Sequence, residues 1–233
     1  MDSIILCGGL GSRLTDITKN EVPKPLVKIQ RLSILEWEIA WLRKYGIKHV
    51  ILAVGHKAKI VQDFLGSSLD TDYGSVDLSY SIEPKKLGSG GAIRFAKDFL
   101  STKDFLILNG DILTNFPLND LLSFHHSRST LGTLALTLLP SPYGIVDFSS
   151  DDHLISSFRE KPLLPHWLHA GVDIFSTSII DDFPVEGQME ETIFVSLAAN
   201  SQLSAFQIAE SFYWRSIDTA KDFKEAEKGW VGL

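Results

Sequence analysis

The chain has 233 residues, of which 44% are hydrophobic and 22% charged, an ordinary composition for a soluble globular protein with a sizeable core. Its formal net charge of -7 argues against nucleic acid as the main partner, because nucleic-acid binders usually carry a basic face. The single cysteine excludes an internal disulfide, and neither a basic, apolar leader nor a membrane-spanning apolar run is seen, so we expect a cytoplasmic protein with no membrane partner.

The first half of the chain alternates short apolar runs with helical segments. Strands are expected at residues 3–7, 49–54, 76–82 and 105–108, and helices at residues 33–45, 57–65 and 92–100. Ser33 and Glu36 have the spacing of a capping box, and Gly46 follows as a C-terminal stop. Strands that are apolar throughout, with helices between them, indicate βαβ units on a parallel sheet covered on both faces.

The second half has a different pattern, with strand-like segments and few helices between them. These segments are residues 133–139, 144–148, 154–160 and 172–175, and the last amphipathic helix covers residues 219–228. Thr219 and Asp222 cap this helix. The pattern predicts an antiparallel extension of the same sheet, so residues 1–233 are expected to form one Rossmann-like α/β domain with a mixed, mostly parallel sheet.

A glycine-rich turn, Gly8-Gly9-Leu10-Gly11-Ser12-Arg13, follows the first strand directly. Glycines allow a tight turn whose successive N–H groups can hold an anion. Leu14 stands where a dinucleotide-binding turn needs its third glycine, and no P-loop run occurs. Arg13 offers a planar fork to phosphate oxygens, and Pro23-Lys24-Pro25 holds a lysine on a stiff segment. These residues fit either a triphosphate site or a rigid surface loop.

Two further motifs each allow a structural and a functional interpretation. Asn109-Gly110-Asp111 ends a buried strand, where α/β sheets bind ligands, so Asp111 is either a turn former or a Mg²⁺ ligand. The run from Leu87 to Ala92, L-G-S-G-G-A, is either a glycine-rich helix start or a backbone surface on which a flat base can lie.

The motif G-G-L-G-S-R-L at residues 8–14, with Thr18 and the P-K-P at residues 23–25, resembles the signature of the sugar-1-phosphate nucleotidylyltransferases. Enzymes of that family transfer a nucleoside monophosphate from an NTP to a sugar 1-phosphate. The resemblance runs from Ile4 to about Phe223. The double glycine followed by Ala92-Ile93 looks most like the mannose- and heptose-1-phosphate guanylyltransferases, which favours GTP as the NTP.

The resemblance implies a role for each matching residue. Catalysis is expected from Arg13, Lys24, Asp111 and Lys161, with Asp111 as a ligand of Mg²⁺. NTP binding is expected from Leu6, Gly8, Gly9, Gly11, Ser12, Arg13, Gly88 and Gly90. Glu160-Lys161-Pro162, Tyr143-Gly144-Ile145-Val146 and His169-Ala170-Gly171-Val172 resemble sugar-side motifs, so sugar-phosphate binding is expected from Gly144, Glu160, Lys161 and Gly171. The antiparallel extension then forms the sugar side of the site.

The chain departs from the family pattern near its second expected metal ligand. Trp214 to Thr219 reads W-R-S-I-D-T where the family commonly has W-x-D-I-G-T, so Ser216 replaces the acid and Asp218 replaces the glycine. Residues 216 and 218 point to the same face of a strand, so Asp218 can bind the metal, bond the sugar or cap the last helix. His169 stands in place of an asparagine, and we assign it no role.

Two other functions remain open at this point. A cytidylyltransferase acting on phosphocholine or inositol phosphate is favoured by the D-T at residues 218–219, although the E-K-P motif opposes it. A non-catalytic regulator that binds an NTP or an NDP-sugar is suggested by Ser216. The sequence does not name the sugar, and it leaves the oligomeric state open, a homodimer included.

Overall fold

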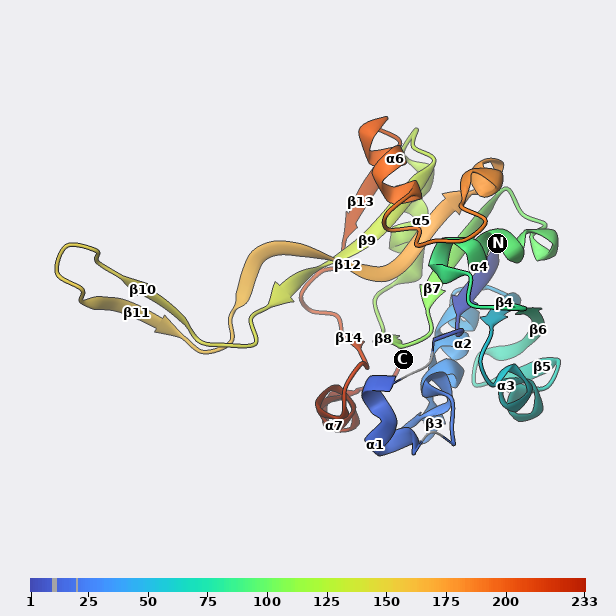
Figure 1. Cartoon of the computed structure of the whole chain (residues 1–233), viewed down its shortest axis with the longest axis horizontal. Coiled ribbons are helices and arrows are strands. Elements are labelled where there is room, and N and C mark those ends of the chain that lie inside the picture. Colours follow the sequence, from blue (N-terminus) through green and yellow to red (C-terminus); the bar gives the residue numbers. More distant parts are fainter. Residues whose placement is uncertain (10–11, 20) are drawn as a thin grey trace.

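In the computed structural model, which describes residues 1–9, 12–19 and 21–233, the centre of the molecule is an eight-stranded mixed sheet (Figure 1). In spatial order its strands are β13 (Leu203–Gln207), β9 (Gly132–Pro140), β12 (Leu163–Ser176), β7 (Asp104–Asn109), β1 (Asp2–Leu6), β4 (His49–Val54), β6 (Gly74–Ile82) and β5 (Ser68–Thr71). The central strands β7, β1, β4 and β6 pair in parallel, whereas β12 runs antiparallel to β7 and to β9. The mixed, mostly parallel α/β fold expected from the sequence is therefore confirmed.

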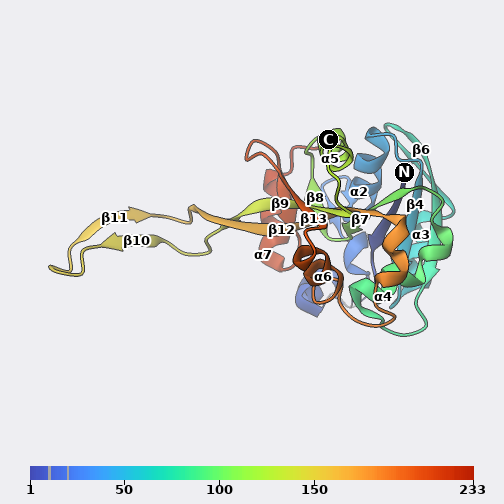
Figure 2. The same cartoon turned by 90° about the horizontal axis from the view of Figure 1, so that it is seen from above.

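Helices cover both faces of this sheet (Figure 2). One face packs against α2 (Ile34–Lys44), α3 (Ala58–Leu65) and α5 (Leu118–His126). The other packs against α4 (Gly88–Phe95), the 3-10 helix η4 (Thr177–Asp182) and α6 (Ile193–Ala199). Strand residues such as Ile4, Ile51 and Ile107 are completely buried between the layers. The burial of both faces explains why these strands read as apolar runs.

Smaller elements complete the fold. They are α1 (Thr15–Thr18), α7 (Ala220–Gly229), the 3-10 helices η1 (Ser12–Leu14), η2 (Lys24–Leu26) and η3 (Lys97–Phe99), and the paired short strands β2 (Lys28–Ile29) with β3 (Leu32–Ser33) and β8 (Ile112–Thr114) with β14 (Trp214–Ser216). Both expected capping boxes are present, at Ser33 with Glu36 and at Thr219 with Asp222. Gly46 has a φ of 87°, as a left-handed helix stop requires.

One helix begins earlier than the sequence suggests. The expected glycine turn at residues 88–91 is the first turn of α4, which starts at Gly88 instead of Ala92. A Cβ on Gly90 would lie 2.7 Å from Pro184, and one on Gly91 would lie 2.8 Å from the carbonyl oxygen of Val185. These glycines are therefore needed for close packing of the helix against the segment 184–189.

The expected antiparallel extension is only partly realised. β9 and β12 join the main sheet, but β10 (Ile145–Phe148) and β11 (Ile155–Arg159) do not. They pair with each other and form a ribbon that projects far from the body (Figures 1 and 2). We call the segment 141–162 the arm. The expectation that residues 144–148 and 154–160 belong to the same sheet is therefore wrong, because β9 and β12 continue past the sheet edge as a paired ribbon.

Candidate active site

The glycine turn and the Asn109-Gly110-Asp111 turn emerge side by side from the sheet. β1 and β7 are parallel neighbours, and their register places Leu6 opposite Asn109. The backbone N–H of Gly110 donates to the carbonyl oxygen of Leu6 over 3.1 Å. A Cβ on Gly110 would lie 2.8 Å from that same oxygen, so the close approach of the two turns requires glycine here. The carboxyl ends of the two strands thus form one edge of the site, as is usual in α/β sheets.

A second pairing brings the C-terminal segment to the same place. β14 runs antiparallel to β8 with Ser216 opposite Ile112, and the N–H of Ile217 donates to the carbonyl oxygen of Asp111 over 2.8 Å. Ile217 is completely buried in a cluster with Leu14, the residue after Arg13. Because their neighbours are buried together, Arg13 and Asp218 are held near Asp111.

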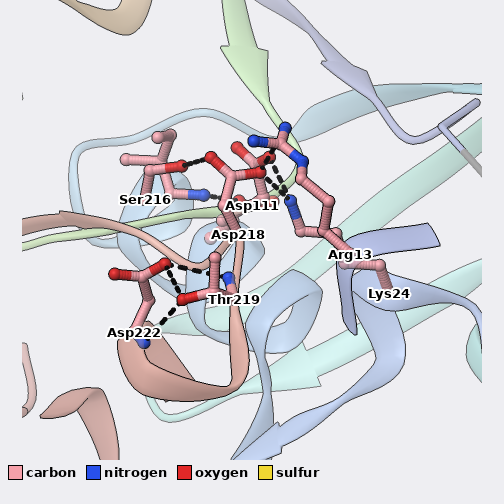
Figure 3. Close-up of polar contacts among 9 residues, drawn as sticks. Arg13, Lys24, Asp111, Ser216, Asp218, Thr219 and Asp222 are labelled. Atoms are coloured by element: carbon pink, nitrogen blue, oxygen red, sulfur yellow. Dashed lines mark hydrogen bonds and ion pairs between the residues drawn. The ribbon is translucent and has the colours of Figure 1, made fainter. Parts of the chain in front are cut away.

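The charged side chains of these segments form one cluster (Figure 3). Lys24 Nζ lies 2.6 Å from Asp111 Oδ2 and 2.9 Å from Asp218 Oδ1, and Arg13 Nη2 lies 3.0 Å from the same Asp218 oxygen. Ser216 Oγ donates to Asp218 Oδ2 over 2.9 Å. The Lys24 side chain is only 13% exposed, whereas that of Arg13 is 73% exposed. Two carboxylates, one from the middle of the chain and one from near its C-terminus, therefore converge on one cation.

The electrostatics of Asp218 favour its ionised form. Partial burial raises the pKa of its carboxyl group, but the hydrogen bond and charge of Lys24, the Ser216 hydroxyl and the charge of Arg13 outweigh that effect. The net result is a pKa below the ordinary value for aspartate. Asp218 is thus a carboxylate in the ordinary working range of pH, as a metal ligand must be.

A buried glutamate lies beneath the cluster. Glu38 is 3% exposed, and its Oε1 accepts a hydrogen bond from the N–H of Ile112 over 3.1 Å. Burial and the nearby charge of Asp111 raise the pKa of Glu38 well above its ordinary value, against the opposing effects of the Ile112 N–H and Lys24. The side chain therefore holds a proton far above the usual glutamate range while it anchors the residue after Asp111.

Two cavities adjoin the cluster. The first has a volume of about 330 Å³ and is lined by Leu6, Cys7, Gly9, Arg13, Lys24, Pro25, Lys86, Gly110, Asp111 and Asp218. The second has a volume of about 300 Å³ and is lined by Leu6, Gly8, Gly9, Ala53, Glu83, Lys86, Gly88, Ser89, Ala92 and Gln188. The shared residues Leu6, Gly9 and Lys86 connect them. A charged chamber beside a less charged one suits a nucleotide whose phosphates and base are bound separately.

The carboxylate pair also suits a divalent cation. Asp111 and Asp218 already hold a positive charge between them. Mg²⁺ is usually bound through one or two carboxylates together with phosphate oxygens and water, and this pair fits that pattern. Ser216, which replaces the family's usual acid, bonds Asp218 and so supports the neighbouring carboxylate.

The other nucleotide-site residues expected from the sequence are partly assembled here. Gly8, Gly9 and Gly88 line the cavities with Leu6. Gly90 is instead buried against Pro184 and is not among the lining residues of either cavity. Ser12 begins η1, and the expectation for Gly11 falls outside the described residues.

The expected sugar-side residues lie in two places. Gly171 has a φ of 72° at an irregularity of β12, and a Cβ there would lie 2.8 Å from Asn109 Nδ2, so it packs over the edge of the site. Gly144, Glu160 and Lys161 belong to the arm, which extends away from the cluster of Figure 3 (Figure 1). Lys161 Nζ lies 3.6 Å from Glu160 Oε1, and both side chains are more than half exposed. Within one chain, the structure does not bring these three residues to Asp111.

Several residues of the site escaped sequence reasoning. Lys86 lines both cavities, and a lysine pair directly before the second glycine motif was the available signal. Glu83 Oε2 accepts a hydrogen bond from the N–H of Leu87 over 2.8 Å and so fixes the start of α4, but no local pattern marks it. His169 Nε2 lies 2.8 Å from Oδ2 of the completely buried Asp173, whose charge raises the pKa of the histidine despite burial, which lowers it. This pairing gives His169 a structural partner.

The fold and the site together define a class of protein. A Rossmann-like sheet that presents a glycine turn, paired cations and two carboxylates at its strand ends is built to bind a nucleotide and transfer a phosphate-linked group. The chain matches the Nucleotidyl transferase family over residues 2–230, and it belongs to that family.

Two relatives and one solved structure illustrate what this chain is similar to. The catalytic subunit beta of mannose-1-phosphate guanylyltransferase from Dictyostelium discoideum is 36% identical over 229 residues, and the mannose-1-phosphate guanyltransferase of Gibberella zeae is 33% identical over 231 residues. Both matches cover 96% of this chain, which spans 62% of the length of those relatives. The crystal structure of HddC from Yersinia pseudotuberculosis has the same fold, with a TM-score of 0.74 at 25% identity over 97% of this chain and 98% of that one.

The described residues, 1–9, 12–19 and 21–233, include no helix whose length and apolar character would allow it to cross a membrane.

Proposed function

We propose that this chain transfers GMP from GTP to a sugar 1-phosphate of the mannose or heptose type, releasing pyrophosphate and forming a GDP-sugar in a Mg²⁺-dependent reaction. Two related observations on the sequence support the choice of substrates. The similar curated proteins are mannose-1-phosphate guanylyltransferases, and the Gly90-Gly91-Ala92 motif favours that branch. The observation that carries the proposal is the convergence of Asp111 and Asp218 on Lys24 beside the glycine turn.

The reaction is an in-line substitution at the α-phosphorus of GTP. An oxygen of the sugar phosphate forms a bond to that phosphorus, the bond to the bridging oxygen breaks, and pyrophosphate leaves with the electron pair. The nucleophile is already an anion, so no proton needs to be removed. Catalysis then consists of positioning and charge neutralisation.

Different residues of the chain contribute to this positioning and charge neutralisation. Lys24 is nearly buried and held on the proline-flanked turn η2, so it can neutralise charge at the reacting phosphate. Arg13 is largely exposed and can close over the outer phosphates. Asp111 and Asp218 would hold Mg²⁺, which supplies positive charge to the phosphate oxygens when it is bound. In this scheme, GTP takes the place of the carboxylates as the partner of Lys24 and Arg13.

The cavity that contains Glu83, Ser89 and Gln188 is the candidate base site. Ser89 Oγ donates to Gln188 Oε1 over 3.0 Å, so the amide of Gln188 is already oriented at the rim of this cavity. An amide and a carboxylate can read the edge of a purine by hydrogen bonding. Gly88 also lines this cavity, and a Cβ on it would lie 2.5 Å from the carbonyl oxygen of Gly187, so glycine is needed for close packing at the start of α4.

The test is pyrophosphate release by the purified chain with each of the four common NTPs, each combined with a panel of sugar 1-phosphates, phosphocholine and inositol phosphate. GTP with mannose or heptose 1-phosphate should give the highest kcat/KM, and removal of Mg²⁺ with EDTA should abolish turnover. Preference for CTP with phosphocholine or inositol phosphate would favour the alternative cytidylyltransferase. GTP binding without pyrophosphate release from any pair would identify a regulator and refute the proposed activity.

A further inference from the structure

The arm is a two-stranded ribbon with no third strand or helix against it in Figures 1 and 2. β10 and β11 pair from Ile145 opposite Arg159 to Phe148 opposite Ile155, and the N–H of Ser141 donates to the carbonyl oxygen of Pro162 over 2.9 Å at its base. Isolated two-stranded ribbons are at best marginally stable in water and normally require a packed face. The arm therefore needs a partner surface.

The two faces of the arm differ in character. One face carries an ion pair, with Arg159 Nη1 2.6 Å from Asp147 Oδ2. Side chains alternate along a strand, and the register places Val146 opposite Phe158 on the other face. Val146, Phe148 and Phe158 are 41%, 61% and 63% exposed. The arm thus has the alternation of a half-buried sheet, but its apolar face is open to solvent.

Gly144 lies at this apolar face, where close packing leaves no room for a larger residue. A Cβ on Gly144 would lie 2.5 Å from the ring of Phe158, so the ring lies across the glycine backbone. Ile155 is paired with Phe148 and is 67% exposed. These side chains form a continuous strip along the ribbon, an arrangement that marks an interaction surface.

A groove lies where the arm leaves the body. Its volume is about 410 Å³, and its apolar lining includes Leu138, Leu163, Ile208, Phe212 and Trp214. The rest of its lining is polar and includes Glu210, Arg215, Ser216, Asp218 and Asp222, so the groove borders the charged cluster. Each copy of the chain consequently carries both an apolar ribbon and a partly apolar groove that borders its site.

We propose that two copies of this chain exchange their arms, so that the apolar face of each arm packs into the groove of its partner and brings Lys161 to the partner's phosphate site. A two-fold arrangement satisfies both surfaces at once, as in exchanged elements of other symmetric dimers. In its own chain, Pro140 and Leu163 at the base of the arm line the groove, and their pairing directs β10 and β11 away from the body, so this ribbon does not fold back into its own groove.

The exposed apolar area matches what a dimer needs. Six large apolar side chains of the arm are 41–76% exposed: Tyr143, Val146, Phe148, Leu154, Ile155 and Phe158. With roughly 150–250 Å² for a complete aromatic side chain and somewhat less for an aliphatic one, they expose about 600 Å² per chain. Two exchanged arms would then bury about 1,200 Å² of arm surface, at the lower end of the usual range for a stable interface.

Charge explains why Lys161 is the residue to be delivered. The cavity of one chain contains Arg13, Lys24 and Lys86, and two of these cations are balanced by Asp111 and Asp218. A triphosphate together with a phosphate monoester requires more positive charge than this. The Lys161 side chain is 55% exposed, its ammonium group lies 3.6 Å from Glu160 Oε1, and it can supply this charge. This part of the inference rests on the proposed function, which requires a second phosphate in the site.

Mixed dimers of two variants test whether Lys161 acts in the site of the partner chain. Lys161→Ala and Asp111→Asn variants, each weakly active, are unfolded together and refolded at equal concentrations. In arm exchange, every mixed dimer has one site with an intact core and an intact arm, so about a quarter of the wild-type rate should return. If Lys161 serves its own chain, each site of a mixed dimer keeps one defect and the mixture gives no more than the mean of the two variants, which would overturn the proposal.

Sedimentation tests the arm interface without any assay of activity. Wild type should sediment as a dimer and Phe158→Asp as a monomer, whereas Val195→Asp, which alters an equally exposed apolar residue of α6, should stay dimeric. A monomeric wild type, or a dimeric Phe158→Asp protein, would refute arm exchange. If wild type is a dimer but releases no pyrophosphate, the proposed function fails while this experiment still decides the interface.

Discussion

The metal role of Asp218 can be tested by a single charge deletion. Asp218→Asn retains the shape of the side chain and an oxygen that can accept from Ser216 or Lys24, but it removes the negative charge. A pair of unit charges at about 4 Å contributes ~1 kcal/mol in water and ~4 kcal/mol at an effective dielectric of 20. The Asp218 side chain is 31% exposed, so an intermediate value of about 2–3 kcal/mol applies. We therefore predict a decrease of about 30- to 150-fold in kcat/KM.

The measurement is the rate of pyrophosphate release as a function of Mg²⁺ concentration, with GTP and mannose 1-phosphate. Asp218→Asn should require more Mg²⁺ for half-maximal rate, since a charged ligand is missing. Ser216→Asp restores the family's usual acid and should retain or raise activity. Asp222→Asn is a matched control, because it removes a charge from the same segment, where Asp222 contacts the cap of α7 and Arg215 but none of Arg13, Lys24 and Asp111. That control should cost about 1 kcal/mol of stability and leave the rate unchanged.

The reasoning fails if Asp218→Asn turns over at the wild-type rate with an unchanged Mg²⁺ requirement. Asp218 would then serve only to pair with Lys24 and Arg13 in the free protein. If Asp218→Asn and Asp222→Asn lose activity equally, the loss reflects a disturbed start of α7 instead of a missing ligand.

Four further substitutions probe other parts of the site. Asp111→Asn should lower turnover by orders of magnitude while the melting temperature holds or rises, and near-normal activity with Mg²⁺ would remove Asp111 from the metal site. Lys161→Ala should raise KM mainly for the sugar phosphate and Arg13→Ala mainly for GTP, each by about 10- to 150-fold, and equal effects on both substrates would contradict this division. Because the pKa of Glu38 is raised in the folded state, its proton stabilises the fold at low pH, and that stability is lost as pH rises above about 4.3 toward the folded pKa. Glu38→Gln should therefore gain stability relative to wild type as pH increases in thermal melts, and parallel pH profiles would refute a protonated Glu38.

Local patterns in the sequence determined much of this protein's secondary structure and several positions of its candidate site. The sequence indicated an α/β fold, both capping boxes and the strand-end position of Asp111, since each depends on residues close together in the chain. It also predicted Arg13 and Lys24 for a phosphate site, and the structure brings the two cations together at Asp218. These motifs could be recognised because backbone turns and charged forks have fixed local requirements.

Tertiary structure decided how those pieces meet. Lys24 and Asp218 are 194 residues apart, and only the pairing of β8 with β14 brings Asp218 beside Asp111. The sequence left Asp218 three possible roles, because the residues of a short strand do not determine which other strand it pairs with. The burial of Glu38 was equally hidden, since a glutamate on a helix usually faces water.

The arm shows most clearly what the sequence alone does not determine. From the sequence, the segments around Gly144 and Lys161 read as ordinary sheet strands with sugar-side motifs, and their alternation was correct. Alternation fixes which face of a strand is apolar, but it does not say which surface covers that face. In the structure this apolar face is open to solvent, because the paired strands β9 and β12 carry the ribbon away from the body of the chain.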